Sequence, residues 1–229
     1  MNEPFESSPP QHKATEVRTS QNKQEMCQAG VKAAGETFKS EFGPLIQDQM
    51  AVATTVGLIE ILPHDKFIEG MPVHRPDDEH TLGYRSLLGK VAIDSDAMNS
   101  QSHAYQVAYH EMLEEISAKS GRNLRSYHKF HDGIIQYFVR KTMQEQRMEY
   151  DLSGYEERAD IVAILIQKGV PEELWKKALV NDDAFRNLMQ TTNEVLENEQ
   201  GFRKIDWALD KNDWPAIIHL LSRFAPDVK

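Results

Sequence analysis

From residue 101 onwards, the sequence is a series of helix-length segments in which apolar residues recur at helical spacing. The segment from Ile161 to Ile166 is apolar almost all round, which is typical of a helix at the centre of a domain. Pro171 is followed by two glutamates, a typical helix start. We expect helices at about 101–120, 131–149, 156–168, 171–180, 182–196 and 213–224. This part of the chain predicts a bundle of helices.

The part of the chain before residue 101 predicts a small sheet, together with helices. The best strand candidate is 87–95, with Val91 and Ile93 on one face. The apolar stretch 45–62 has the length of a buried helix, while its Val, Thr and Ile content allows part of it to be a strand. Residues 24–42 fit a weak amphipathic helix, and the proline-rich stretch 63–84 is expected to be a long loop. The predicted fold class is therefore α+β, mostly α.

The first 24 residues are polar and low in apolar content, so they are expected to form a disordered tail. The remainder, 25–229, is expected to form a single domain. The tail has two interpretations: an unimportant chain end, or an address recognised by a secretion apparatus or another partner.

Composition excludes several classes of protein. There are 26 Lys and Arg against 36 Asp and Glu, a formal net charge of −10 without a basic stripe, so nucleic acid and anionic membranes are not expected partners. The single cysteine, Cys27, excludes an internal disulfide framework and a cysteine-based zinc finger. We expect no membrane span and no secretory signal peptide. The chain is thus expected to be made in the cytoplasm, with any export using a signal-peptide-independent system.

Two neighbouring segments carry the residues most suited to chemistry. In the first, His110-Glu111-Met112-Leu113-Glu114, the imidazole and the last carboxylate are four residues apart and share one helical face. Both can therefore converge on one ion, with Glu111 placed where a general base reaches an ion-bound water. The second segment, 127–138, holds a carboxylate and two imidazoles in its first turn, and a short loop at 121–123 would fold it back toward the first.

Together these segments resemble the zincin-like metallopeptidases of the gluzincin type, in which a His-Glu-x-x-His helix is followed by an Asn-Glu-Gly-x-x-Glu-Tyr-Phe helix. The resemblance covers roughly residues 85–190 and implies a zincin-like domain with a small sheet and a bundle of helices. It implies a divalent metal ion, zinc in the family, and a general base. Carried over by position, the ligands are His110, Glu114 and Asp132, and the base is Glu111. The alternative third ligands are His131 and His128. Tyr137 and Tyr155 are candidate oxyanion donors, with packing in the core as the alternative role of each.

The sequence departs from the family pattern at two ligand positions. Glu114 stands where the family has its second histidine, and Asp132 stands where it has a glutamate. Two carboxylates and one imidazole make a more anionic site, which shifts preference from zinc toward manganese and other oxygen-preferring ions. The additional ligand charge also makes the ion a poorer Lewis acid.

Three functions follow from the sequence. The first is a metal-dependent peptidase of the bacterial effector or toxin type, acting on a protein or peptide that pairs with a strand such as Val91–Asp94. The second is a catalytically inactive binding module of the same fold. The third is an unrelated helical adaptor, which predicts that His110 and Asp132 lie far apart.

Overall fold

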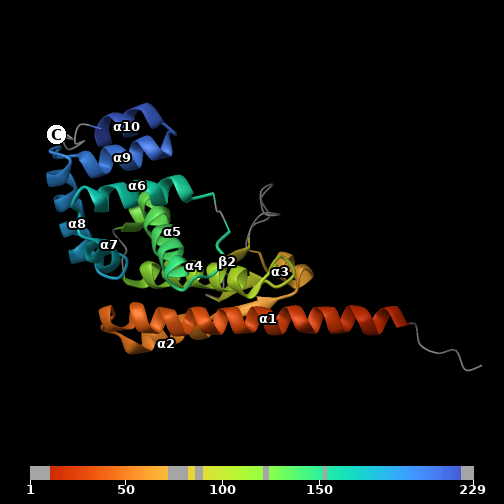
Figure 1. Ribbon diagram of the computed structural model, residues 1–229. Helices are drawn as coiled ribbons and strands as arrows, with labels where there is room; N and C mark the ends of the chain where they lie inside the picture. Colours follow the sequence, from red (N-terminus) through yellow and green to blue (C-terminus); the bar gives the residue numbers. More distant parts are fainter. Residues whose placement is uncertain (1–10, 72–81, 86–89, 121–123, 152–153, 223–229) are drawn as a thin grey trace, which may run out of the picture.

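The computed structural model describes residues 11–71, 82–85, 90–120, 124–151 and 154–222. The described chain is mostly helical with one small sheet, as the sequence predicts, and Figure 1 shows α1 running along one side, its N-terminal part extending beyond the rest. The elements are α1 (Gln11–Glu41), a 3-10 turn (Gly43–Leu45), α2 (Gln49–Gly57), β1 (Ile59–Leu62), α3 (His64–Gly70), β2 (Gly83–Arg85), β3 (Val91–Asp94), α4 (Gln101–Ser120), a second 3-10 turn (Leu124–Ser126), α5 (His128–Glu145), α6 (Glu156–Gln167), α7 (Glu172–Ala178), α8 (Asp182–Val195), α9 (Gly201–Asp210) and α10 (Trp214–Ser222).

The sheet has the strand order β1-β3-β2. β3 is parallel to β1, with Ile59 opposite Val91, and antiparallel to β2, with Gly83 opposite Ile93. All four residues of β3 are buried, as expected for a central strand. The prediction that Val91–Asp94 pairs with an extended substrate is therefore wrong, because β1 and β2 already occupy both edges of this strand.

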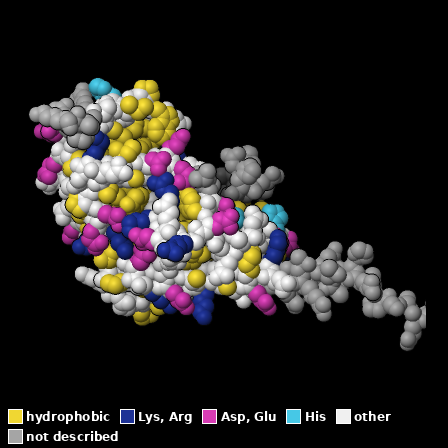
Figure 2. Space-filling view, viewed as in Figure 1, with side chains coloured by type: hydrophobic (Ala, Val, Ile, Leu, Met, Phe, Trp, Pro, Cys, Tyr) yellow, Lys and Arg dark blue, Asp and Glu magenta, His cyan; other side chains and the backbone are white. Residues whose placement is uncertain are grey.

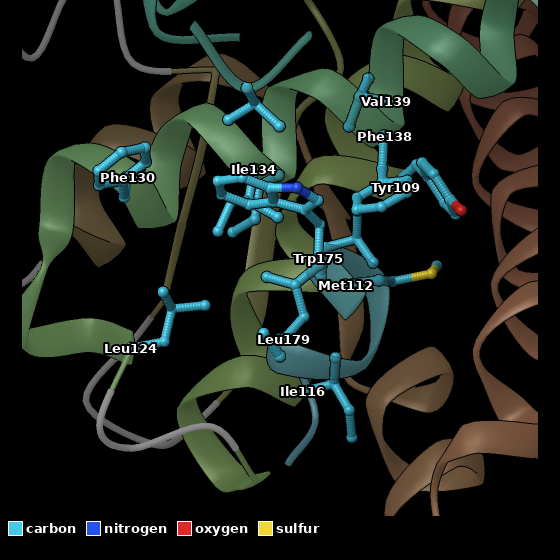
Figure 3. Packing of buried hydrophobic residues seen from close by; sticks show 14 of the residues in the cluster. Tyr109, Met112, Ile116, Leu124, Phe130, Ile134, Phe138, Val139, Trp175 and Leu179 are labelled. Carbon is cyan, nitrogen blue, oxygen red and sulfur yellow. The ribbon is translucent and has the colours of Figure 1, made fainter. Parts of the chain in front are cut away.

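The hydrophobic core lies where α4 and α5 pack against each other and against α1, α6 and α7. Figure 3 shows side chains of α4, among them Met112, and side chains of α5, among them Ile134 and Phe138, in one cluster with Trp175. Trp175 of α7 is fully buried in this cluster. Because α4 and α5 are fixed in the core, the polar side chains at their margin have a rigid support.

The structure differs from the sequence expectations in three regions of the chain. α1 continues back to Gln11, where the sequence predicted a tail as far as residue 24; residues 11–24 lack glycine and proline and include several good helix formers, and residues 1–10 lie outside the described part. The expected loop 63–84 contains α3 and β2. α9 was not predicted, although Phe202, Ile205 and Leu209 follow a helical period and are buried.

The surface of the molecule carries mixed charge. Figure 2 shows acidic and basic side chains interspersed on the visible face, with apolar side chains gathered over α9 and α10. Among the helices that the structure describes, none has both the length and the apolar character that a membrane span needs.

Candidate functional site

α4 places the residues of the first motif at the edge of the core. Its apolar residues Met112 and Leu113 are fully buried, so the helix cannot rotate without exposing them. His110 and Glu114 lie one turn apart on this helix, and the imidazole Nε2 lies 3.3 Å from a carboxylate oxygen of Glu114. The structure thus brings together the first two residues that the sequence singled out.

Asp132 approaches the same place from the first turns of α5. Its carboxylate accepts a hydrogen bond from Arg158 of α6 at 2.5 Å, and both side chains are mostly buried. The neighbouring Gly133 makes this pairing possible, because a Cβ atom there would lie 2.9 Å from the backbone oxygen of Arg158. α6 therefore contacts α5 closely enough to place its arginine beside Asp132.

Tyr155 covers the site from the residue before α6. Its ring stacks on the His110 imidazole with a centroid distance of 5.8 Å and an interplanar angle of 17°. The guanidinium carbon of Arg158 lies 4.9 Å from the centre of the same ring, a cation–π arrangement. The ring of Tyr155, one of the two candidate oxyanion donors, thus packs against both the imidazole of His110 and the guanidinium of Arg158.

Glu111 lies against the backbone of β2. A Cβ atom at Gly83 would lie 2.6 Å from a carboxylate oxygen of Glu111, so only glycine allows this approach without a shift. Burial raises the pKa of Glu111, the charge of Glu114 raises it further, and the neighbouring His110 opposes them. The candidate base is therefore a partly buried carboxyl that holds its proton more firmly than an exposed glutamate.

Electrostatics tie the residues of both motifs together. Burial disfavours protonation of His110, but the hydrogen bond that the imidazole donates to Glu114 and the charges of Glu114, Glu111 and Asp132 outweigh it and raise the pKa of the imidazole. Burial also raises the pKa of Tyr155, with Asp132 and Glu114 contributing in the same direction.

The other predicted residues have partners of their own. His131 is buried, with its Nε2 2.8 Å from the hydroxyl of Ser117 on α4. His128 is exposed and lies 3.4 Å from a carboxylate oxygen of Asp210 on α9. The Tyr137 hydroxyl donates to Glu172 of α7 at 2.9 Å, and burial together with this bond raises its pKa to about 12. Each of these side chains links two helices.

The donor set does not fit a three-ligand metal centre as it stands. Across the ranges that the structure describes, no group of three or more His, Cys, Asp or Glu side chains could hold a metal ion. At this site the guanidinium of Arg158 binds the carboxylate that would be the third ligand. His110 and Glu114 remain as a pair.

Compared with protein-family models, with curated proteins and with solved structures, the chain matches none of them. The site is therefore interpreted from its own geometry.

Sequence reasoning missed two parts of this site, Arg158 and the β2 backbone at Gly83. For Arg158 a signal was present: it is the third residue of α6, where the helix dipole disfavours a cation. A basic residue at such a position needs an acidic partner from another element, and Asp132 is that partner. For Gly83 no local signal exists, because its contact with Glu111 depends on the packing of β2 against α4.

Proposed function

We propose that the protein is a binding module for extended polypeptides, built on a zincin-like site that works without a metal ion. The observation that carries the proposal is the ion pair between Asp132 and Arg158. The sequence resemblance assigns a metal ligand to Asp132, and a carboxylate that already accepts from a guanidinium does not also bind a cation without losing that partner.

The polypeptide would pair with β2. The backbone N–H of Asp94 donates to the oxygen of Leu82, so Gly83 and Ile93 form the non-hydrogen-bonded pair of this antiparallel ladder. The N–H and C=O groups of Gly83 consequently point away from β3, toward the outer edge of the described sheet. An extended chain can add to such an edge through backbone hydrogen bonds.

The chemistry beside this edge favours a basic side chain in the bound polypeptide. Glu111 lies directly against Gly83, and the half-exposed Glu114 is one turn further along α4. A lysine or arginine of the bound chain near Gly83 would meet both carboxyl groups and lower the cost of keeping Glu111 ionised. The proposed ligand is therefore an extended peptide with a basic residue at this position.

Capture from a mixture of synthetic peptides of random sequence tests the proposal. The immobilised protein is incubated with the peptides, and bound and unbound fractions are identified by mass spectrometry. We expect uncleaved captured peptides enriched in Lys and Arg, a lower basic enrichment with Glu111→Gln, and loss of capture with Gly83→Pro, which removes the outward N–H. Circular dichroism of each variant controls for folding. Capture that Gly83→Pro leaves unchanged would contradict pairing at β2.

A metal-dependent peptidase is the second candidate, and one distance favours it. Two ligands of a tetrahedral ion with bonds of about 2.1 Å lie roughly 3.4 Å apart, and the atoms His110 Nε2 and Glu114 Oε1 are 3.3 Å apart. In this candidate His110, Glu114 and Asp132 would hold the divalent ion, zinc or manganese, and Glu111 would be the base. Cleaved peptides in the capture experiment, with cleavage abolished by chelation and by Glu111→Gln, would establish it.

A further inference from the structure

The C-terminal pair of helices, α9 and α10, leaves two large apolar side chains in contact with solvent. Trp207 of α9 and Ile218 of α10 are each 61% exposed. α10 contains no Lys, Arg, Asp or Glu, so no charged side chain of its own covers its outer face. Figure 2 shows apolar side chains gathered over both helices. Neither candidate function uses this surface, and an exposed apolar patch of this kind marks a site of interaction.

Trp207 lies at the centre of the exposed face of α9. Arg203 and Lys204 are exposed one turn before it, and Asp210 and Lys211 are exposed one turn after it. We call these five residues the Trp207 face. Three cations and one anion give it a net charge of +2, whereas the whole chain carries −10. An acidic surface with room for an indole therefore complements it.

A groove of that kind lies on the same molecule, along α8 and the turn that follows it. Its volume is about 520 Å³, which is within the range of sites that enclose small molecules. Glu194, Glu197 and Glu199 line it together with Arg186, so its net charge is −2. Met189 also lines the groove, and a thioether makes favourable contacts with aromatic rings. The groove thus matches the Trp207 face in charge and in chemistry.

The groove and the Trp207 face are neighbours. The Lys204 Nζ donates to the side-chain oxygen of Asn198 at 3.3 Å, and Asn198 lines the groove. Adjacent patches of opposite charge form a self-complementary surface, because a two-fold axis between two copies places each patch opposite the other. We infer that two copies of this chain form such a dimer, with Trp207 of each copy in the acidic groove of the other. The inference uses no residue of the α4 site and does not depend on peptide binding.

Sedimentation equilibrium of the full chain measures the dissociation constant of the dimer. The wild type is expected to dimerise. Trp207→Ala is expected to raise the dissociation constant about tenfold or more, since a buried tryptophan at the centre of an interface often dominates its affinity. Met50→Ala is the matched control, because Met50 is 77% exposed on α2, outside both surfaces, and its loss should leave the dissociation constant unchanged. Circular dichroism shows whether each variant is folded.

A charge exchange tests the pairing of the two surfaces. One variant carries Arg203→Glu and Lys204→Glu, and the other carries Glu194→Lys and Glu199→Lys. Each variant alone is expected to be monomeric at concentrations at which the wild type is dimeric, because both contacts between its copies then join like charges. An equimolar mixture of the two variants is expected to regain the dimer, because each contact in the mixed pair joins opposite charges.

Three results would overturn the inference. The first is a wild type that stays monomeric at about 100 μM, well above the micromolar affinity at the weak end for interfaces of standard size. In that case, binding to vesicles of phosphatidylserine and phosphatidylcholine that Trp207→Ala abolishes would assign the Trp207 face to an anionic lipid surface instead. The second is a Trp207→Ala variant that dimerises as tightly as the wild type. The third is a mixture of the two charge variants that stays monomeric.

Discussion

Two histidine–carboxylate pairs of this protein are built in opposite ways. At the α4 site the imidazole is the buried member: the side chain of His110 is 16% exposed and that of Glu114 is 44% exposed. At the end of the sheet the carboxylate is the buried member: His64 is 58% exposed and Asp94 is 3% exposed, with the two side chains 2.6 Å apart. The same chemical pair thus has its charge-bearing carboxylate at the surface in one case and in the interior in the other.

The difference shows which pair the fold depends on. A buried carboxylate needs several donors, and one oxygen of Asp94 accepts from the backbone N–H groups of Asp96 at 2.9 Å and Ala97 at 3.4 Å, while the other faces His64. A buried imidazole can remain neutral, so His110 makes no comparable demand. We therefore interpret Asp94 as part of the framework and Glu114 as a residue on which folding depends much less.

The largest expected effect comes from removing the two carboxylates one at a time. Asp94→Ala leaves buried backbone donors without an acceptor and should lower the free energy of unfolding by about 3 kcal/mol. Glu114→Ala removes a half-exposed group and should cost less than about 1 kcal/mol. Urea denaturation followed by circular dichroism measures both. Equal losses in the free energy of unfolding would show that the difference in burial between the two carboxylates does not affect stability.

A second change disrupts the contact that closes the α4 site. Gly133→Ala places a Cβ atom 2.9 Å from the backbone oxygen of Arg158, so α5 and α6 must separate. We expect a loss of about 2 kcal/mol in the free energy of unfolding, in the range typical of overpacked interiors. Gly57→Ala at the end of α2 is the matched control, because a Cβ there meets no atom within 4 Å. A smaller loss at Gly133 than at Gly57 would contradict this account of the contact.

The two regions also differ in how well the sequence predicted them. The helix 101–120 was predicted with the bounds of α4, because no glycine or proline interrupts the sequence between Gln101 and Ser120. The contact between α4 and α5 followed from two helices joined by a short connection, whereas the meeting of Asp132 and His110 stays a prediction. The Asp94–His64 pair was not predicted, because it joins residues thirty positions apart across a proline-rich stretch, and sequence periodicity does not report which strand ends meet. The contacts of Tyr155 with His110 and Arg158 were not predicted either, because they depend on how the helices pack.

Glu111 provides a smaller test on the α4 side. Its raised pKa means that the native state binds a proton more firmly than the unfolded chain, so native stability falls as pH rises above the unfolded value of about 4.5. Glu111→Gln removes this penalty and should stabilise the protein by about 1 kcal/mol at pH 8, with little difference at pH 4. Urea denaturation at both pH values measures the change. Glu114→Gln is the control, since its half-exposed side chain already bonds to His110, and a stabilisation of similar size there would refute the role of burial at Glu111.

The smallest expected effect belongs to His64 and concerns pH alone. The hydrogen bond to Asp94 and then the charge of Asp94 raise the pKa of this imidazole above its usual value; desolvation opposes them, and the charges of Asp96 and Asp65 add smaller increases. A raised histidine pKa stabilises the folded state fully below the unfolded pKa of about 6.5, and this contribution disappears as pH rises through the folded value. Denaturation of the wild type and His64→Gln between pH 5 and 9 should therefore show a difference that is largest at acidic pH and shrinks toward alkaline pH. A difference that grows with pH would mean that the neutral imidazole, rather than the charged one, is the form that Asp94 holds.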